Sequence, residues 1–211
     1  YSTLSSNHLS KIVANDDQFL SYKNTLSDQG YMNLKYLTQY AVKHNPLELN
    51  KMQTFLKKKS FYVVGTNMDT GKPVYLEPTR NNIYRCLRAT SSLPFVTKGL
   101  CRINNKPLMD GAWSDPIPAK YAAELGSSKI IVIRPYPSNY KLDGINLLGV
   151  LAGYWWSKNK TISSLFQNEY HCYNQAVDFL NKKHKTIELA QICPSDFLRS
   201  SIIGGSNLDL E

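Results

Sequence analysis

The stretch that decides the fold occupies residues 108–118 and reads LMDGAWSDPIP. Its first two residues end a segment, residues 100–109, that we expect to have an extended backbone. An aspartate directly before a proline is typical of a helix start, with Asp115 as the N-cap and Pro116 at the first helical position. The helix is expected to run to about Leu125, where Gly126 would stop it.

A short apolar run, residues 130–133 with the sequence IIVI, follows this helix. A strand that is apolar on both faces is typical of the centre of a parallel sheet, because helices cover such a sheet on both sides. The order strand, loop, helix, strand across residues 103–133 predicts a βαβ unit. We therefore expect an α/β fold with a largely parallel sheet.

The remaining elements are expected from hydrophobic periodicity and turn residues. Residues 1–59 read as mostly helical, residues 61–77 as a hairpin around the turn signal Asp69-Thr70-Gly71, and residues 83–87 as part of a helix capped by Asn81 or Asn82. Helices are predicted over 145–156 and 161–183, a strand over 186–192, and a loop at Gly204-Gly205-Ser206.

Composition places the chain among ordinary globular proteins. Its 211 residues suit one α/β domain, and 42% are hydrophobic while 19% are charged. The net charge of +9 favours anionic partners such as phospholipid headgroups or nucleic acid. Lysine is nevertheless well spread, with one dense run at Lys57-Lys58-Lys59, and no nucleic-acid motif accompanies it. Nucleic acid is therefore not expected as a partner.

The cysteines and histidines suggest neither a disulfide framework nor a metal site. Cys86, Cys101, Cys172 and Cys193 form no C-x-x-C pair, and the four histidines lack the spacing of metal ligands. We expect reduced thiols in a cytosolic environment, with no cofactor and no metal. We see no signal peptide and no apolar stretch of about 20 residues that could cross a membrane. Because the chain opens at Tyr1, we expect a fragment or a processed chain.

Asp110 is the strongest candidate for a chemical role. It ends an extended segment, precedes Gly111 and stands before a helix, and ligand sites in open α/β sheets gather at such strand ends. A glycine after the acid allows a tight turn and a close approach by another chain or a substrate. The Asp-Gly pair is also a common turn signal, and Asp143-Gly144 is interpreted as a turn of that kind.

The wider context of Asp110 resembles the patatin-like phospholipase family, in its bacterial branch. Residues 88–96, RATSSLPFV, resemble the small-residue Ser-x-x-Pro segment that precedes the family's catalytic aspartate, and Asp110-Gly111-Ala112 resembles its Asp-Gly-Gly/Ala motif. Residues 115–118, 61–75 and 194–196 resemble its helix entry, its strand-turn-strand and a segment near its C-terminus. The resemblance covers roughly residues 55–200.

The resemblance implies a serine esterase or phospholipase that uses a Ser-Asp dyad. Asp110 would be the base, and its pKa would be raised by partial burial beside Met109 and Trp113. The family's serine lies in a G-x-S-x-G elbow near a glycine-rich oxyanion loop, and neither pattern occurs in this chain. The serine is therefore expected outside this chain. Ser91 and Ser92 are interpreted as close-packing residues near the active-site loop.

The resemblance further implies a three-layer α/β/α domain with a largely parallel sheet, and residues 1–211 would be a single fragment of it that is incomplete at the N-terminus. Within this fragment, residues 1–59 would be mostly helical and residues 60–200 would form the core. The parent protein is expected to be a carboxylic-ester hydrolase of lipid degradation, and this chain alone to be inactive. Expected partners are a phospholipid or other acyl ester, an anionic membrane, and an N-terminal fragment of the same protein. A bacterial cytoplasm is the expected location, with export as an effector kept open. The alternative is an inactive patatin-like scaffold that binds lipid or a protein.

Overall fold

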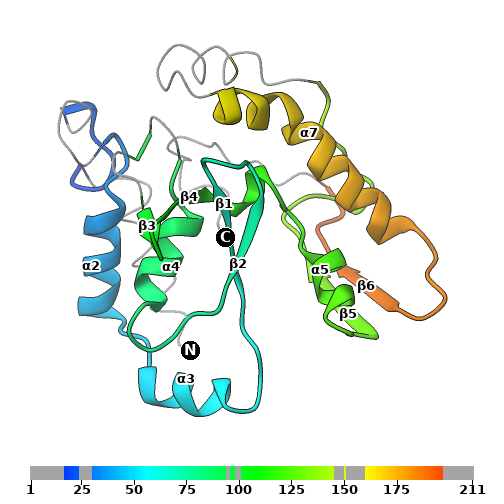
Figure 1. Cartoon of the computed structure of the whole chain (residues 1–211), viewed down its shortest axis with the longest axis horizontal. Coiled ribbons are helices and arrows are strands. Elements are labelled where there is room, and N and C mark those ends of the chain that lie inside the picture. Colours follow the sequence, from blue (N-terminus) through cyan, green and yellow to red (C-terminus); the bar gives the residue numbers. More distant parts are fainter. Residues whose placement is uncertain are drawn as a thin grey trace.

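The computed structural model describes residues 17–23, 30–93, 96–97, 101–144, 150 and 160–196. These residues form a mixed α/β molecule, as the sequence predicts (Figure 1). The helical elements are α2 (Leu34–His44), α3 (Leu49–Leu56), α4 (Ile83–Thr90), the 3-10 turn η2 (Gly111–Trp113), α5 (Ala119–Glu124) and α7 (Lys160–Asn181). The strands are β1 (Val63–Asn67), β2 (Pro73–Leu76), β3 (Cys101–Ile103), β4 (Lys106–Asp110), β5 (Lys129–Ile133) and β6 (Glu188–Ile192).

The larger sheet has the strand order β2-β1-β4-β3, and every neighbouring pair in it is antiparallel. The predicted hairpin over 61–77 is confirmed as β1 and β2. Residues 101–110 form a second hairpin, whose two-residue turn places Asn104 and Asn105 at φ 50° and 62°. Two-residue turns with positive φ join antiparallel strands, and asparagine tolerates that backbone. The prediction of a largely parallel sheet is therefore wrong for this sheet.

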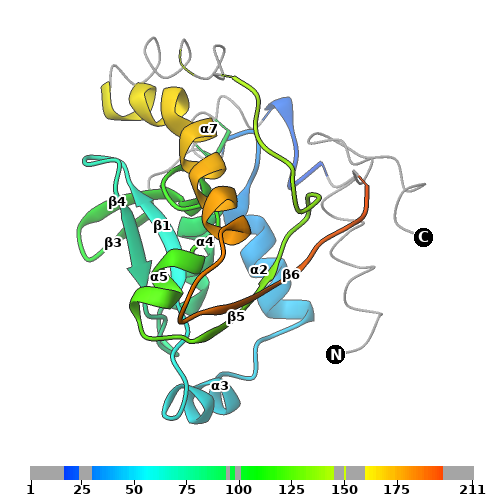
Figure 2. The same cartoon turned by 90° about the vertical axis from the view of Figure 1, so that its right-hand side faces the viewer.

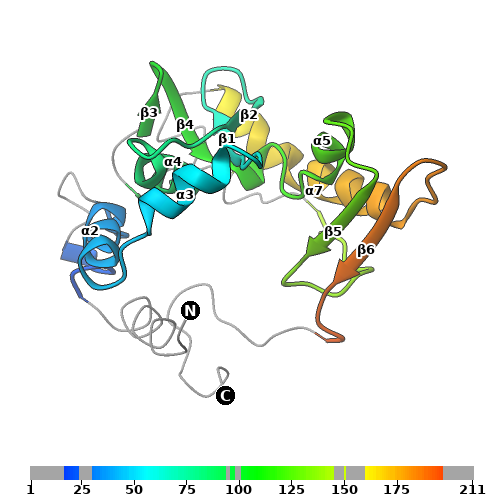
Figure 3. The same cartoon turned by 90° about the horizontal axis from the view of Figure 1, so that it is seen from below.

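The second sheet pairs β5 and β6 in parallel, from Lys129 opposite Glu188 to Ile133 opposite Ile192. Helix α7 lies in the connection between them, as a parallel pair requires (Figure 2). The βαβ unit is thus β5-α7-β6, and the predicted unit over 103–133 is wrong because β4 and β5 belong to different sheets (Figure 3). Strand β5 is also covered on one face rather than both, since Ile131 and Ile133 are 70% and 78% exposed.

Two groups of buried side chains form the core. One packs α4 against the antiparallel sheet and contains Val63, Cys86, Ala89, Ile103 and Leu108. The other packs α5 and α7 against β5 and contains Ile117, Ala119, Ile130, Val132, Tyr173, Val177 and Leu180. Helix α7 also reaches the first sheet, because Thr161 Oγ1 donates to Asp69 O at 3.2 Å in the β1–β2 turn. One long helix therefore spans both halves of the described molecule.

The helix after the motif begins later than predicted. Its first residue is Ala119 and its N-cap position is Pro118, so the assignment of Asp115 as cap and Pro116 as first helical residue is wrong. The Asp115 carboxylate instead accepts a hydrogen bond from Tyr75 Oη at 2.5 Å, across to β2. The end of the helix is as predicted, because α5 stops at Glu124 and Gly126 has φ 89°.

Most other local predictions are confirmed. Helices α2 and α3 lie within the region expected to be helical, α7 matches the helix predicted over 161–183, and β6 matches the strand predicted over 186–192. Helix α4 follows Asn82, whose side chain accepts from Thr79 N at 2.6 Å rather than from a helical N–H. Residues 1–16 of the region expected to be helical lie outside the described residues, as does the loop predicted at residues 204–206. Of the helix predicted over 145–156, only Val150 is described.

Candidate functional site

Asp110 is the last residue of β4, and its backbone is held on both sides. It lies opposite Gly65 of β1, its N–H donates to Ser92 O at 2.8 Å, and its carbonyl accepts from Thr66 Oγ1 at 2.7 Å. Thr66 is fully buried. Because its single hydroxyl hydrogen is donated to the Asp110 carbonyl, the Ser114 hydroxyl must be the donor in its 2.8 Å hydrogen bond with Thr66 Oγ1. These bonds fix the position from which the Asp110 side chain projects.

The surroundings of the Asp110 carboxylate alter its affinity for a proton. Burial raises its pKa above the ordinary aspartate value, and a hydrogen bond from Ala112 N to Oδ1 at 2.8 Å offsets part of this rise. Among the described residues no donor reaches Oδ2. Asp110 therefore keeps one carboxylate oxygen able to accept a proton, in surroundings that strengthen it as a base.

Position 111 requires a glycine because the backbone of Val64 lies too close for a side chain, and not because of the dihedral angles of Gly111. A Cβ at this position would lie 2.3 Å from the carbonyl oxygen of Val64 and 2.7 Å from its carbonyl carbon. Thr90 Oγ1 donates to that same oxygen at 2.5 Å, which holds the Val64 peptide in place. The expected close approach after Asp110 is confirmed, and the approaching chain is strand β1.

The hydroxyls of the two neighbouring serines donate hydrogen bonds to backbone carbonyls of α4. Ser92 is buried, its carbonyl binds Asp110 N, and its hydroxyl donates to Arg88 O at 2.7 Å. The exposed Ser91 donates to Leu87 O at 3.1 Å. Neither hydroxyl bonds to Asp110 within the described part of the chain. The interpretation as a close-packing residue is confirmed for the buried Ser92 and is wrong for Ser91, which is exposed.

Apolar residues flank the motif, as expected. Met109 is 1% exposed, and the Trp113 ring meets Phe166 of α7 edge-on, with 4.3 Å between ring centroids. Asp110 thus lies between residues with apolar contacts, and burial is the main cause of its raised pKa.

The motif borders a cavity of about 570 Å³ that extends from Ala112 past Pro116–Ala119 to β5. Its lining is mostly apolar and includes Ile130 and Val132, with Arg134 beyond the end of β5. Asp110 is not itself part of the lining, but its hydrogen-bond partner Ala112 is. An apolar substrate group could therefore lie within two residues of Asp110.

A second cavity of about 570 Å³ lies on the other side of the loop and contains Tyr75, Asp115 and Cys172. The Tyr75 ring stacks on Tyr121 with centroids 3.5 Å apart and planes at 1°. Burial raises the pKa of Asp115, and the Tyr75 hydroxyl lowers it in part. Burial, together with the Asp115 charge, raises the pKa of the Cys172 thiol, which argues against a nucleophilic cysteine. Sequence reasoning missed the Tyr75–Asp115 pair, whose members are 40 residues apart.

The described residues contain no group of three or more His, Cys, Asp or Glu side chains that could hold a metal ion. Among the same residues, no helix combines the length and apolarity needed to span a bilayer.

Comparison with known proteins gives a distant relative. No protein-family model matches the chain. The chain is 27% identical, over 176 residues, to the Escherichia coli (strain K12) protein described as "Uncharacterized protein YjjU". The match covers 82% of this chain and 49% of YjjU, so the chain spans about half the length of this relative.

Proposed function

We propose that this chain supplies the aspartate base of a Ser-Asp dyad lipid acyl hydrolase, a serine esterase or phospholipase of the patatin-like type. The observation that carries the proposal is the setting of the Asp110 carboxylate. Its pKa is raised, no donor among the described residues reaches its Oδ2, and it lies at a strand end where the Val64 backbone leaves no room for a side chain at position 111. The apolar cavity that begins at Ala112 has room for an acyl chain.

In the proposed reaction, Asp110 accepts the hydroxyl proton of a serine as the serine oxygen attacks an ester carbonyl. As the ester C–O bond breaks and the acyl-serine forms, Asp110 passes this proton to the leaving alcohol oxygen. Asp110 then accepts a proton from the water that attacks the acyl-serine, and returns it to the serine oxygen when the carboxylic acid is released. The serine and the oxyanion donors are proposed to lie in a segment of the longer protein outside this chain, either covalently continuous or retained as an N-terminal fragment. A three-layer α/β/α domain, completed by that segment, belongs to the same proposal.

The partners and location are part of the proposal. A phospholipid or another acyl ester is the substrate, and the net charge of +9 favours peripheral contact with an anionic membrane. A bacterial cytoplasm, or export from it as an effector, is proposed on the family resemblance, and the bacterial origin of YjjU is compatible with it.

The test is turnover of a short-chain p-nitrophenyl ester by the full-length protein and by Asp110→Asn. Loss of the base is expected to lower kcat by about 10²–10⁴-fold. Asp143→Asn is the matched control, because Asp143 is an exposed aspartate that also precedes a glycine. Wild-type turnover in Asp110→Asn would refute the dyad.

One observation favours the alternative, an inactive scaffold that binds lipid or a protein partner. The Asp110 side chain caps η2 through Ala112 N, a structural role that needs no catalysis. The scaffold predicts no ester turnover by the full-length protein, together with binding to phospholipid vesicles or to a protein that is unaffected by Asp110→Asn. Turnover that depends on Asp110 would exclude it.

A further inference from the structure

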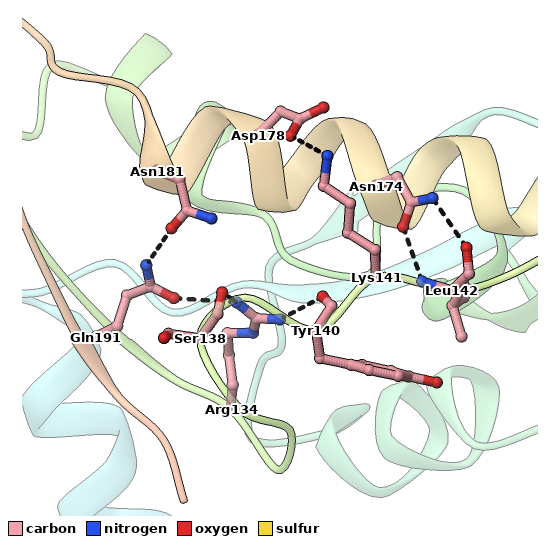
Figure 4. Close-up of polar contacts among 9 residues, drawn as sticks. All are labelled: Arg134, Ser138, Tyr140, Lys141, Leu142, Asn174, Asp178, Asn181 and Gln191. Atoms are coloured by element: carbon pink, nitrogen blue, oxygen red, sulfur yellow. Dashed lines mark hydrogen bonds and ion pairs between the residues drawn. The ribbon is translucent and has the colours of Figure 1, made fainter. Parts of the chain in front are cut away.

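Arg134 follows β5 and is 5% exposed, and its hydrogen bonds to other described residues are to neutral groups. Its Nη1 donates to Ser138 O and Gln191 Oε1, both at 3.0 Å, and its Nη2 donates to Tyr173 Oη at 2.8 Å and Tyr140 O at 3.5 Å. Figure 4 shows the guanidinium between Gln191 and the carbonyls of Ser138 and Tyr140. These acceptors satisfy most of its donors, and its Cζ lies 5.7 Å from the centroid of the Tyr173 ring, a cation–π contact, but none of these groups carries a negative charge.

The charge of Arg134 is unbalanced within the described residues. None of their ion pairs includes Arg134, and the nearby Asp178 is paired with Lys141 at 2.6 Å. The Nε–H of Arg134 is buried and has no partner among them. Burying a cation without a counter-charge is costly, and an unpaired buried donor adds to that cost. Within the part of the chain that the structure describes, no carboxylate therefore pairs with the Arg134 guanidinium.

The cavity beside Arg134 has the chemistry of an amphiphile site. Arg134 is the one cationic residue among the described residues that line it, and the apolar part of the lining includes Ile130, Val132 and Leu142. A volume of about 570 Å³ suits a small-molecule ligand. The guanidinium of Arg134 carries a single positive charge, which one negative charge on a ligand balances, and Glu169 also lines the cavity. A monoanion with a hydrocarbon tail fits these walls.

We propose that this cavity binds a long-chain carboxylate, with its carboxylate group against the Arg134 guanidinium and its hydrocarbon chain along β5. A carboxylate accepts charge-assisted hydrogen bonds from guanidinium groups in favourable geometry and supplies the negative charge that Arg134 lacks among the described residues. The cavity is the one proposed above for the acyl chain, so the inference rests on the proposed function and adds the group that would bind the ligand's charged end. Binding can be measured without ester cleavage, so a failure of the inference and a failure of the hydrolase proposal are distinguishable.

The experiment is calorimetric titration of the full-length protein carrying Asp110→Asn, so that turnover cannot contribute. Dodecanoate and 1-dodecanol are compared below the concentrations at which they aggregate. Because hydrogen bonds to charged groups stabilise by about 1.5–3 kcal/mol, dodecanoate is expected to bind about ten- to a hundredfold more tightly than the uncharged alcohol. Arg134→Gln should remove this difference and leave the affinity for dodecanol unchanged.

Lys129→Gln is the control, because it removes one positive charge from an exposed side chain of the same strand, outside the cavity lining. It should leave both affinities unchanged. If Arg134→Gln does not fold, the comparison of the two ligands on the protein with Arg134 intact decides the matter. Equal affinities for dodecanoate and dodecanol would overturn the proposal. So would an absence of dodecanoate binding, which would indicate that a carboxylate of the protein itself neutralises Arg134.

Discussion

At the scale of single residues, the charged form of the Asp110 carboxylate is disfavoured by its burial. Burial raises its pKa, so the folded protein holds the proton more tightly than the unfolded chain does. The stability that accompanies protonation is present at low pH and is lost as the pH rises through the folded pKa. At neutral pH the ionised carboxylate therefore lowers the free energy of unfolding, as is common at catalytic positions.

Asp110→Asn is accordingly expected to raise the thermal stability of the protein at neutral pH. The amide keeps an oxygen that can accept from Ala112 N, while the charge is removed. The advantage over wild type should shrink as the pH falls, because wild-type Asp110 then becomes neutral as well. Thermal unfolding at several pH values measures this, with the exposed Asp143→Asn as the control expected to show no pH-dependent shift. A variant less stable than wild type at neutral pH would contradict the assigned cause of the pKa shift.

Gly111→Ala is expected to destabilise the fold by about 1–3 kcal/mol or more, as overpacking does. The new Cβ would meet the backbone of Val64, which cannot turn away as a flexible side chain could. Gly65→Ala is the matched control on the neighbouring strand, because its Cβ would meet atoms at 3.6–3.8 Å, an ordinary contact. Urea unfolding of both variants provides the comparison, and equal destabilisation would show that the close approach to Val64 is not the cause.

At the scale of elements, the hydrogen bond between Tyr75 and Asp115 ties β2 to the loop before α5. Tyr75→Phe keeps the stacking on Tyr121 but loses the hydroxyl, so a loss of about 1 kcal/mol is expected for this partly exposed pair. The pKa of Asp115 should rise further, because the hydroxyl lowers it. A double-mutant cycle with Asp115→Asn measures the coupling, and strictly additive effects would mean that the bond contributes nothing to stability.

At the scale of the whole molecule, α7 connects the two groups of core residues. Its N-terminal part contacts the β1–β2 turn, where Leu165 lies 3.5 Å from the position of a Cβ on Gly71, and its C-terminal part packs on β5. A rigid helix shared by both halves should make them unfold together. The molecule is thus expected to behave as one cooperative unit although its strands belong to two sheets.

Leu108→Ala and Leu180→Ala test this cooperativity from opposite sides. Each removes a buried leucine, at 0% and 5% exposure, and should cost about 2–5 kcal/mol. If the molecule is one unit, either change lowers amide-exchange protection in both β1 and β5. Leu125→Ala, at a position 51% exposed, should leave protection unchanged. Loss confined to the half that carries the substitution would show two independent units.

The sequence by itself determined the local elements and the candidate base. The β1–β2 hairpin, the length of α7, the apolar run of β5 and the stop at Gly126 depend on neighbours along the chain, so periodicity and turn residues were sufficient to predict them. The Asp110-Gly111 pair also stood out locally, and its catalytic role stays a proposal. Arg134 offered a weaker signal, as a charged residue directly after an apolar strand.

Only the tertiary structure decided which strands pair and what the polar side chains contact. The order of elements along the chain predicted that β4 and β5 belong to one βαβ unit. Instead, β4 pairs with β1 and β3, and each residue of β5 pairs with the residue of β6 that is 59 positions later in the sequence. Asp115 has the sequence of a helix cap but binds Tyr75 of another element. The reason is that sheet pairing, buried charge and the contact that requires Gly111 all depend on segments distant in sequence, and local pattern holds no information about which segments meet.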